Sequence, residues 1–113
     1  MKRVIFIAGP YRGANAWQVE QNIQRAEAVA FEVTAMGGIA LCPHTMYRNF
    51  DKTLTDDVWL ENIRELLRRS DGAYFQPGYE NSEGSVDELE HAFQNDVHTF
   101  FTMAEVEEYI NGL

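Results

Sequence analysis

The residues of most chemical interest lie in the stretch from Asp71 to Ala92. An apolar run, Ala73 to Phe75, ends at Pro77-Gly78, and a polar segment then leads into apolar residues with helical spacing. This order predicts a strand, a turn and a helix, and ligands of open α/β sheets bind at loops that follow strands. Glu88, which we place on the first turn of that helix, is our candidate nucleophile. An ionised carboxylate can attack the anomeric carbon of a sugar and form a covalent glycosyl intermediate.

Two interpretations of Glu88 stay open at this stage. Ser85 and Glu88 have the spacing of a capping box, in which the serine caps the helix and the glutamate bonds back to the backbone of the serine. Alternatively, the carboxylate faces a crevice and the positive end of the helix keeps it ionised. The polar turn before it contributes Asn81, Ser82 and Gly84 as candidate substrate-binding residues.

Asp71 is a second candidate catalytic carboxylate, because it opens the predicted third strand. If the strand begins strictly at this residue, Asp71 lies at the edge of the sheet opposite to the loops, and its alternative role is that of a turn residue or of the last residue of the preceding helix. The loop Gly9-Pro10-Tyr11-Arg12-Gly13 follows the first predicted strand, as phosphate-binding and ribose-binding loops do, although it matches neither the dinucleotide nor the P-loop motif. An ordinary tight turn would not explain Arg12, whose planar guanidinium suits bidentate contact with a phosphate. We therefore include Gly9, Tyr11, Arg12 and Gly13 among the candidate substrate-binding residues.

His44 follows Pro43 at the end of a predicted strand and is a further candidate substrate-binding residue, although a structural or solvent-facing histidine is more typical of such a position. His91 lies three residues after Glu88, but a single Glu-x-x-His pair lacks the matching ligands of a metal site. We therefore expect no metal and no other cofactor. Trp17 and Trp59 are more typical of core or interface positions than of stacking platforms.

Strands and helices alternate four times along the chain. Apolar runs predict strands over residues 3–8, 39–42, 72–75 and 97–101, and helical spacing predicts helices over residues 16–36, 56–70, 86–94 and 103–110. The segment from His44 to Thr55 remains as an aromatic loop. This order indicates one α/β domain spanning residues 1–113, a small doubly wound, flavodoxin-like or Rossmann-like parallel sheet of four to five strands flanked by helices. The loops after the first three strands should open at one edge of the sheet.

Composition excludes several functional classes. The 113 residues carry a net charge of −9, and no Lys or Arg follows Arg69, so we expect no nucleic-acid polymer and no membrane as partner. No apolar run reaches the ~18–20 residues of a membrane span, and we interpret the run from Val4 to Ala8 as a strand and not as the apolar region of a signal peptide. Cys42 is the single cysteine, which excludes an internal disulfide and favours a cytoplasmic location. We interpret Cys42 as a packed small apolar residue.

The sequence resembles the nucleoside 2-deoxyribosyltransferase-like superfamily, which includes the deoxynucleoside 5-monophosphate N-glycosidases. The resemblance rests on the first loop, on an Asp that opens the third strand, and on the signature Ser-x-Gly-x-x-x-Glu-Leu-x-x-Ala, here Ser82 to Ala92. It implies that Glu88 is the nucleophile, that Asp71 is its acidic partner, and that Ser82 contacts a 5-phosphate. It also implies that Arg12 and Gly13 belong to a substrate-binding loop.

Two residues depart from the pattern of that superfamily. Phe6 stands where the relatives carry a tyrosine, so a phenolic proton donor is missing there, and Pro10 stands where they carry a serine. Tyr11 is the candidate replacement for the phenol.

The leading hypothesis is an enzyme that hydrolyses or transfers the N-glycosyl bond of a nucleoside or nucleotide, a small-molecule substrate. The alternatives are a nucleotide or nucleotide-sugar sensor without catalytic activity, and an interaction domain that uses the aromatic loop His44 to Phe50 as its partner surface. We also expect a homo-oligomer, because the domain is small and aromatic-rich and the relatives build their sites near subunit interfaces.

Overall fold

The computed structural model describes residues 1–112, in which four strands form a single sheet. All neighbouring strands are parallel, and their order is β2-β1-β3-β4. Their bounds are β1 Val4–Ala8, β2 Ile39–Leu41, β3 Gly72–Phe75 and β4 His98–Phe100. The predicted α/β fold with a parallel sheet is therefore confirmed.

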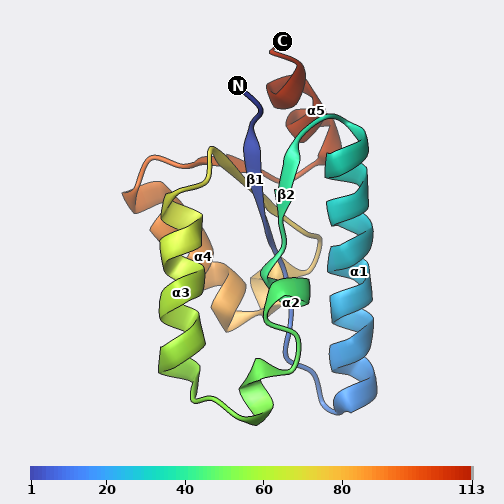
Figure 1. Cartoon of the computed structure of the whole chain (residues 1–113), viewed down its shortest axis with the longest axis vertical. Helices are drawn as coiled ribbons and strands as arrows, with labels where there is room; N and C mark the ends of the chain where they lie inside the picture. Colours follow the sequence, from blue (N-terminus) through green and yellow to red (C-terminus); the bar gives the residue numbers. More distant parts are fainter. Residues whose placement is uncertain (113) are drawn as a thin grey trace.

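Helices cover both faces of the sheet, which makes the fold doubly wound (Figure 1). The four longer helices are α1 Ala16–Ala35, α3 Asp56–Arg68, α4 Glu83–Gln94 and α5 Met103–Asn111. Helices α1 and α5 pack on one face, and α3 and α4 pack on the other. None of these helices, within residues 1–112, combines the length and apolar character that crossing a bilayer requires.

Consecutive residues of β1 build the two halves of the core, because side chains alternate across a strand. Phe6 contributes to a cluster with Trp59 and Ile63 of α3, whereas Ile5 contributes to a cluster with Val33 of α1 and Val106 of α5. Each of these six side chains is at most 7% exposed. The sheet is thus fixed from both sides, and its carboxyl edge is a rigid support for the loops that follow.

The loops after β1, β2 and β3 open at the same edge of the sheet, as predicted, because the strands are parallel and in close register. Ala8 at the end of β1 pairs with Phe75 at the end of β3. Gly9 permits this close approach, since a Cβ at this position would lie 2.3 Å from Nε2 of Gln76. Gln76 in turn donates from Nε2 to the carbonyl of Ala8 at 3.2 Å.

Several of the predicted boundaries differ from those of the structure. The segment predicted as a loop over residues 44–55 contains the short helix α2, Pro43–Met46, and a 3-10 turn, Phe50–Lys52. Pro43 stands at the start of α2, where its missing N–H costs no hydrogen bond. Helix α4 begins at Glu83, three residues before the predicted start, and the strands β2 and β4 are shorter than expected.

Candidate functional site

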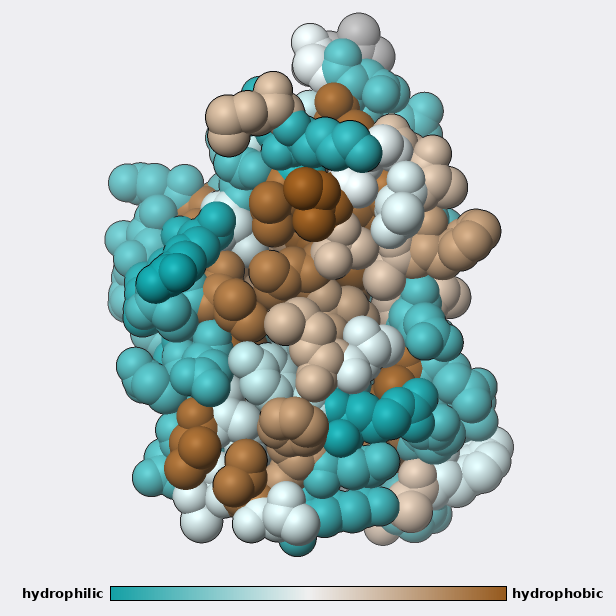
Figure 2. All heavy atoms as spheres, viewed as in Figure 1, coloured by the Kyte–Doolittle hydropathy of each residue, from teal (hydrophilic) through white to brown (hydrophobic). Residues whose placement is uncertain are grey.

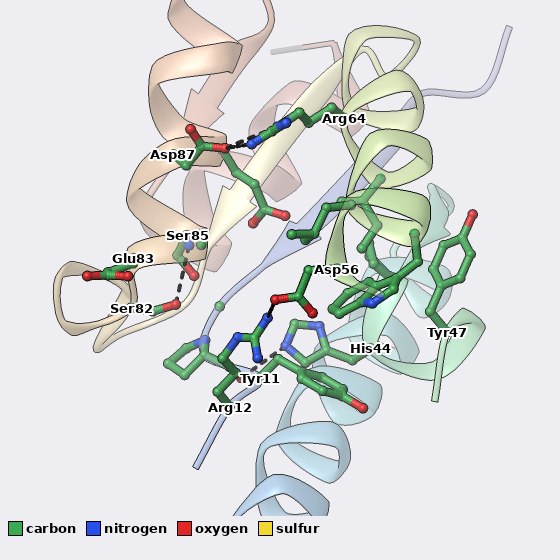
Figure 3. A pocket seen from close by; sticks show the side chains of 18 of the residues that line it. Tyr11, Arg12, His44, Tyr47, Asp56, Arg64, Ser82, Glu83, Ser85 and Asp87 are labelled. Atoms are coloured by element: carbon green, nitrogen blue, oxygen red, sulfur yellow. Dashed lines mark hydrogen bonds and ion pairs between the residues drawn. The ribbon is translucent and has the colours of Figure 1, made fainter. Parts of the chain in front are cut away.

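A cavity of about 550 Å³ opens at the carboxyl edge of the sheet (Figure 3). The first loop, α2, α3 and the start of α4 all contribute to its walls. Among the candidate substrate-binding residues, those that line the cavity are Gly9, Tyr11, Arg12, His44, Asn81, Ser82 and Gly84. The candidate nucleophile Glu88 lines it as well. The structure therefore brings together most of the residues that the sequence places at this edge.

The first loop is held in place from α1. Asn22, which is buried, donates from Nδ2 to the carbonyl oxygens of Tyr11 at 3.0 Å and Arg12 at 3.2 Å. The Tyr11 hydroxyl donates to Oδ1 of Asp51 at 2.9 Å and accepts from the Asn49 N–H at 3.2 Å. Burial raises the pKa of Tyr11 above its ordinary value, so the ring remains a neutral phenol. Tyr11 thus connects the first loop to the segment after α2.

Gly13 belongs to the first loop but does not line the cavity. A Cβ at this position would lie 2.6 Å from the Cβ of Gln18 on α1. Its small size therefore lets the loop turn into the helix. The structure gives Gly13 this packing role and places it outside the lining of the cavity.

Both arginines that line the cavity are paired with carboxylates in the described structure. Nη2 of Arg12 lies 2.6 Å from Oδ2 of Asp56, and Nη2 of Arg64 lies 3.1 Å from Oδ2 of Asp87 (Figure 3). The side chains of Arg12 and Asp56 are 64% and 52% exposed, and such exposed pairs contribute little stability. An anionic group of a ligand could therefore take Arg12 from Asp56 at small cost.

His44 is buried at the back of the cavity, with 5% of its surface exposed. Its Nε2 lies 3.0 Å from the carbonyl oxygen of Pro10, so Nε2 carries the proton of the ring and donates. Burial lowers the pKa of His44 below its ordinary value, with the backbone of the first loop opposing that effect. The imidazole is therefore neutral at physiological pH, and its Nδ1 is a lone-pair acceptor.

The turn before α4 is closed by Ser82 and not by Ser85. The hydroxyl oxygen of Ser82 accepts a hydrogen bond from the Ser85 N–H at 3.2 Å, so Ser82 is the N-cap. The predicted capping box of Ser85 with Glu88 is therefore wrong, and Glu88 is free of it. Ser85 lies one turn further in and is 1% exposed. A Cβ on Gly84 would meet no atom within 4 Å, so the helix start faces open space.

Glu88 lies in the second turn of α4, since the helix begins at Glu83. It is half-buried, and within residues 1–112 no group donates a hydrogen bond to its carboxylate. Burial raises its pKa to about 8, with a further rise from Asp87 and an opposing effect from Arg64. The expectation that the helix end keeps Glu88 ionised is therefore contradicted, because the helix begins too early and desolvation dominates. At neutral pH, the carboxyl group of Glu88 therefore holds a proton.

Asp71 lies at the opposite end of the sheet from the cavity. Its Oδ2 accepts a hydrogen bond from the Val4 N–H at 2.7 Å, and its own N–H donates to the carbonyl of Val4 at 3.0 Å. Both bonds join the amino ends of β1 and β3. The structure therefore does not bring Asp71 to Glu88 and gives it the role of a residue that fixes strand register.

Comparison with protein families places the whole cavity inside one known domain. The sequence profile of the family described as "Domain of unknown function (DUF7768)" matches residues 3–102. The chain belongs to this family. The match includes every residue that lines the cavity, from Ile7 to Glu88. No curated protein matches the chain.

This DUF7768 chain has cavity residues on α3 that the sequence interpretation missed. They are Asp56, Trp59, Leu60, Ile63 and Arg64. Their spacing of three and four residues marks one face of a helix, and this signal was present in the sequence. It indicated only burial, because the same spacing is typical of a core face. The strand order is what places α3 beside the cavity.

The cavity offers no evident cation site. Within residues 1–112, no group of three or more His, Cys, Asp or Glu side chains is arranged to hold a metal ion. Cys42 packs at 4% exposure against Ile7 and Ala26, which confirms its interpretation as a small apolar residue. The side chains that line the cavity carry carboxyl, hydroxyl, amide, imidazole, indole and guanidinium groups.

Proposed function

We propose that this protein cleaves the N-glycosyl bond of a nucleoside, deoxynucleoside or 5-monophosphate, with Glu88 as the group that bonds to the sugar. The observation that carries the proposal is Glu88 itself. Its carboxyl group lies half-buried in a cavity of about 550 Å³ and receives no hydrogen bond from residues 1–112. A carboxyl group held without a structural partner in a cleft is typical of a functional site. The resemblance to N-glycosyl-bond enzymes points to the same residue.

The reaction balances with Glu88 protonated at the start. As the bond from C1 to the base nitrogen breaks, its electron pair stays with the base, and the Glu88 proton passes to the base directly or through water. An oxygen of Glu88 then bonds to C1 and forms a glycosyl ester. In hydrolysis, the hydroxyl of a water molecule joins C1 and its remaining proton returns to Glu88. In transfer, a second base takes the place of the water.

The charge of the cavity bears on the choice between nucleoside and monophosphate. Glu83, Asp56 and Asp87 line the cavity beside Glu88, and Arg12 and Arg64 are paired with two of them. A 5-phosphate therefore has to displace Asp56 from Arg12, whereas a neutral nucleoside does not. The start of α4 beside Ser82 compensates in part, because helix N-termini attract anions.

A substrate panel tests the proposal. Purified protein is incubated with purine and pyrimidine deoxynucleosides, ribonucleosides and their 5-monophosphates, with and without a free acceptor base. Chromatography then measures the released base and any new nucleoside. We expect release of free base from at least one member of the panel, in equal amount to the sugar product. Absence of base release from every member contradicts the proposal.

A sensor without catalytic activity is the second candidate function, and two observations favour it. Phe6 is fully buried in β1, so no phenol occupies that place, and the hydroxyl of Tyr11 is bonded to Asp51. The sensor predicts that a nucleotide raises the melting temperature without being consumed. The interaction domain is less favoured, because His44 and Tyr47 of its proposed surface line the cavity.

We also propose a homo-oligomer in the cytoplasm. Large apolar side chains are exposed on three elements: Trp17 and Phe31 of α1 at 68% and 74%, Phe93 of α4 at 62%, and Ile39 of the edge strand β2 at 45%. Apolar atoms also gather between α3 and α1 on the face that Figure 2 shows. Such exposed apolar surface marks contact sites. Light scattering on the purified protein should give a mass of at least twice 13.0 kDa, and a monomeric mass contradicts the proposal.

A further inference from the structure

Three buried side-chain polar atoms have no hydrogen-bond partner within residues 1–112. They are Nδ1 of His44, Nε1 of Trp59 and Oγ of Ser85. The three residues are 5%, 7% and 1% exposed, and all of them line the cavity. Buried polar groups are nearly always paired in folded proteins, so three unpaired groups around one cavity indicate a ligand that pairs them.

These atoms offer a defined set of contacts. Nδ1 of His44 is an acceptor, because Nε2 of the same ring donates to the carbonyl of Pro10. Nε1 of Trp59 carries a hydrogen and can only donate. The hydroxyl of Ser85 can do both, and it lies three residues before Glu88 on the same side of α4. A ligand must therefore present a donor to His44 and an acceptor to Trp59.

The ring of Tyr11 lies beside the rings of both His44 and Trp59, which carry two of these unpaired atoms. The ring centroid of Tyr11 lies 5.8 Å from that of His44 and 6.0 Å from that of Trp59. We call these three residues the aromatic corner. The corner has flat ring faces, one free donor (Trp59 Nε1) and one free acceptor (His44 Nδ1). Flat apolar walls with a few placed polar groups are typical of sites that bind a planar heterocycle.

Other parts of a nucleotide fit the corner less well. A phosphate presents only acceptor oxygens, and the lone pair of His44 Nδ1 would face one of them unfavourably. A sugar ring has hydroxyls but no flat face to lie against the aromatic rings. A nucleobase has both a flat face and an edge on which an N–H stands beside a carbonyl or a ring nitrogen.

We propose that the aromatic corner binds the base of the substrate, with Trp59 donating to an acceptor on the base edge and His44 accepting from a base N–H. This inference rests on the proposed function for the class of ligand. It adds Trp59 and His44 as the specificity-determining pair and leaves Ser85, beside Glu88, to the sugar.

The test uses free bases, which bind without any bond being cleaved. The sequence has two tryptophans, so the variant Trp17→Phe leaves Trp59 as the only indole that fluoresces. Trp17 is exposed and outside the cavity, so the corner is unchanged. Uracil and hypoxanthine are titrated to millimolar concentration, and 1,3-dimethyluracil serves as the control that keeps the ring and carbonyls but lacks both N–H groups.

We expect a saturable change of Trp59 fluorescence with uracil or hypoxanthine, and roughly tenfold or more weaker binding of 1,3-dimethyluracil. Calorimetry on Trp59→Phe, which keeps an aromatic ring but removes the N–H, should show a similar loss of affinity for the base. Equal binding of the methylated and unmethylated bases overturns the inference, and so does the absence of binding by any base.

The outcomes separate this inference from the proposed function. Selective base binding without base release from nucleosides supports the corner and contradicts the chemistry of Glu88. Base release from nucleosides, together with equal binding of methylated and unmethylated bases, supports the chemistry of Glu88 and contradicts the role of the aromatic corner. The methylated-base comparison needs no substitution in the corner, so it remains decisive if Trp59→Phe does not fold.

Discussion

Replacing Glu88 with Gln should lower base release by about a thousandfold or more while the protein stays folded. The amide has nearly the shape of the carboxyl group, so the cavity keeps its form. It cannot give up a proton to the departing base, and it is a poor nucleophile towards C1. The measurement is the rate of base release from the best substrate of the panel, at saturating concentration, with the wild-type protein and the variant side by side.

Glu90→Gln is the matched control for this experiment. Glu90 lies on the same helix two residues further on, is exposed, and does not line the cavity that Glu88 lines. The control makes the same change from carboxyl to amide on α4 and should keep nearly full activity. If Glu88→Gln and Glu90→Gln retain equal rates, Glu88 is not the nucleophile, even if the cavity proves to bind the substrate.

The sequence predicted the architecture well because the sheet depends on local patterns. Strand β1 is a continuous run of β-branched and aromatic residues, and such runs belong to central parallel strands. Parallel strands need crossover helices, and right-handed crossovers restrict where the loops lie. For that reason the meeting of Tyr11, His44 and Ser82 at one edge could be foreseen from the order of the elements alone.

The start of α4 could not be foreseen, because two serines compete as its cap. Ser82 and Ser85 can both cap a helix, but only Ser85 has a glutamate three positions later. Local sequence favoured Ser85, since Glu88 completes a capping box with it. In the structure Ser85 is nearly fully buried, and the helix therefore begins one turn earlier, at Glu83. Tertiary packing decided between two caps of similar local energy.

Trp59 and Asp71 show a second limit of sequence interpretation. Helical spacing marks Trp59 as buried but does not tell whether its indole N–H meets the core or a cavity. Asp71 directly precedes β3, and which end of a strand faces the site depends on its direction in the sheet. The register of β1 with β3 places Asp71 at the amino end, where it bonds to Val4. The role of Trp59 required the position of the elements in space, whereas the place of Asp71 before a parallel strand already indicated the edge opposite to the site.

The pKa of Glu88 predicts that the carboxyl group makes the protein less stable as pH rises. Burial raises this pKa to about 8 in the folded protein, above the ordinary value of 4.5 that applies to the unfolded chain. Between these two pH values the folded state holds a proton that the unfolded state has lost. The free energy of unfolding therefore falls as pH rises from about 4.5 to about 8, and the full penalty persists above that.

Glu88→Gln removes this titratable group. Most substitutions destabilise a protein, but we expect this one to stabilise the fold at high pH. At pH 9 we expect the variant to be more stable than the wild-type protein by about 1–3 kcal/mol, whereas at pH 4.5 the two should be nearly equal. Urea denaturation at both pH values measures the difference, with Glu90→Gln as the control that changes the surface charge alone. A variant that is equally stable or less stable than the wild-type protein at pH 9 contradicts the buried, proton-holding state of Glu88.

A gain of stability together with a loss of base release in Glu88→Gln would distinguish a role of Glu88 in the reaction from a role in the fold. A residue kept for packing or for a helix cap stabilises the fold, so its loss lowers stability and activity together. A residue kept for chemistry can be costly to the fold, because the desolvation that raises its pKa is unfavourable for its charged form. Opposite signs for Glu88→Gln, with neither effect in Glu90→Gln, would therefore assign the burial of Glu88 to the reaction.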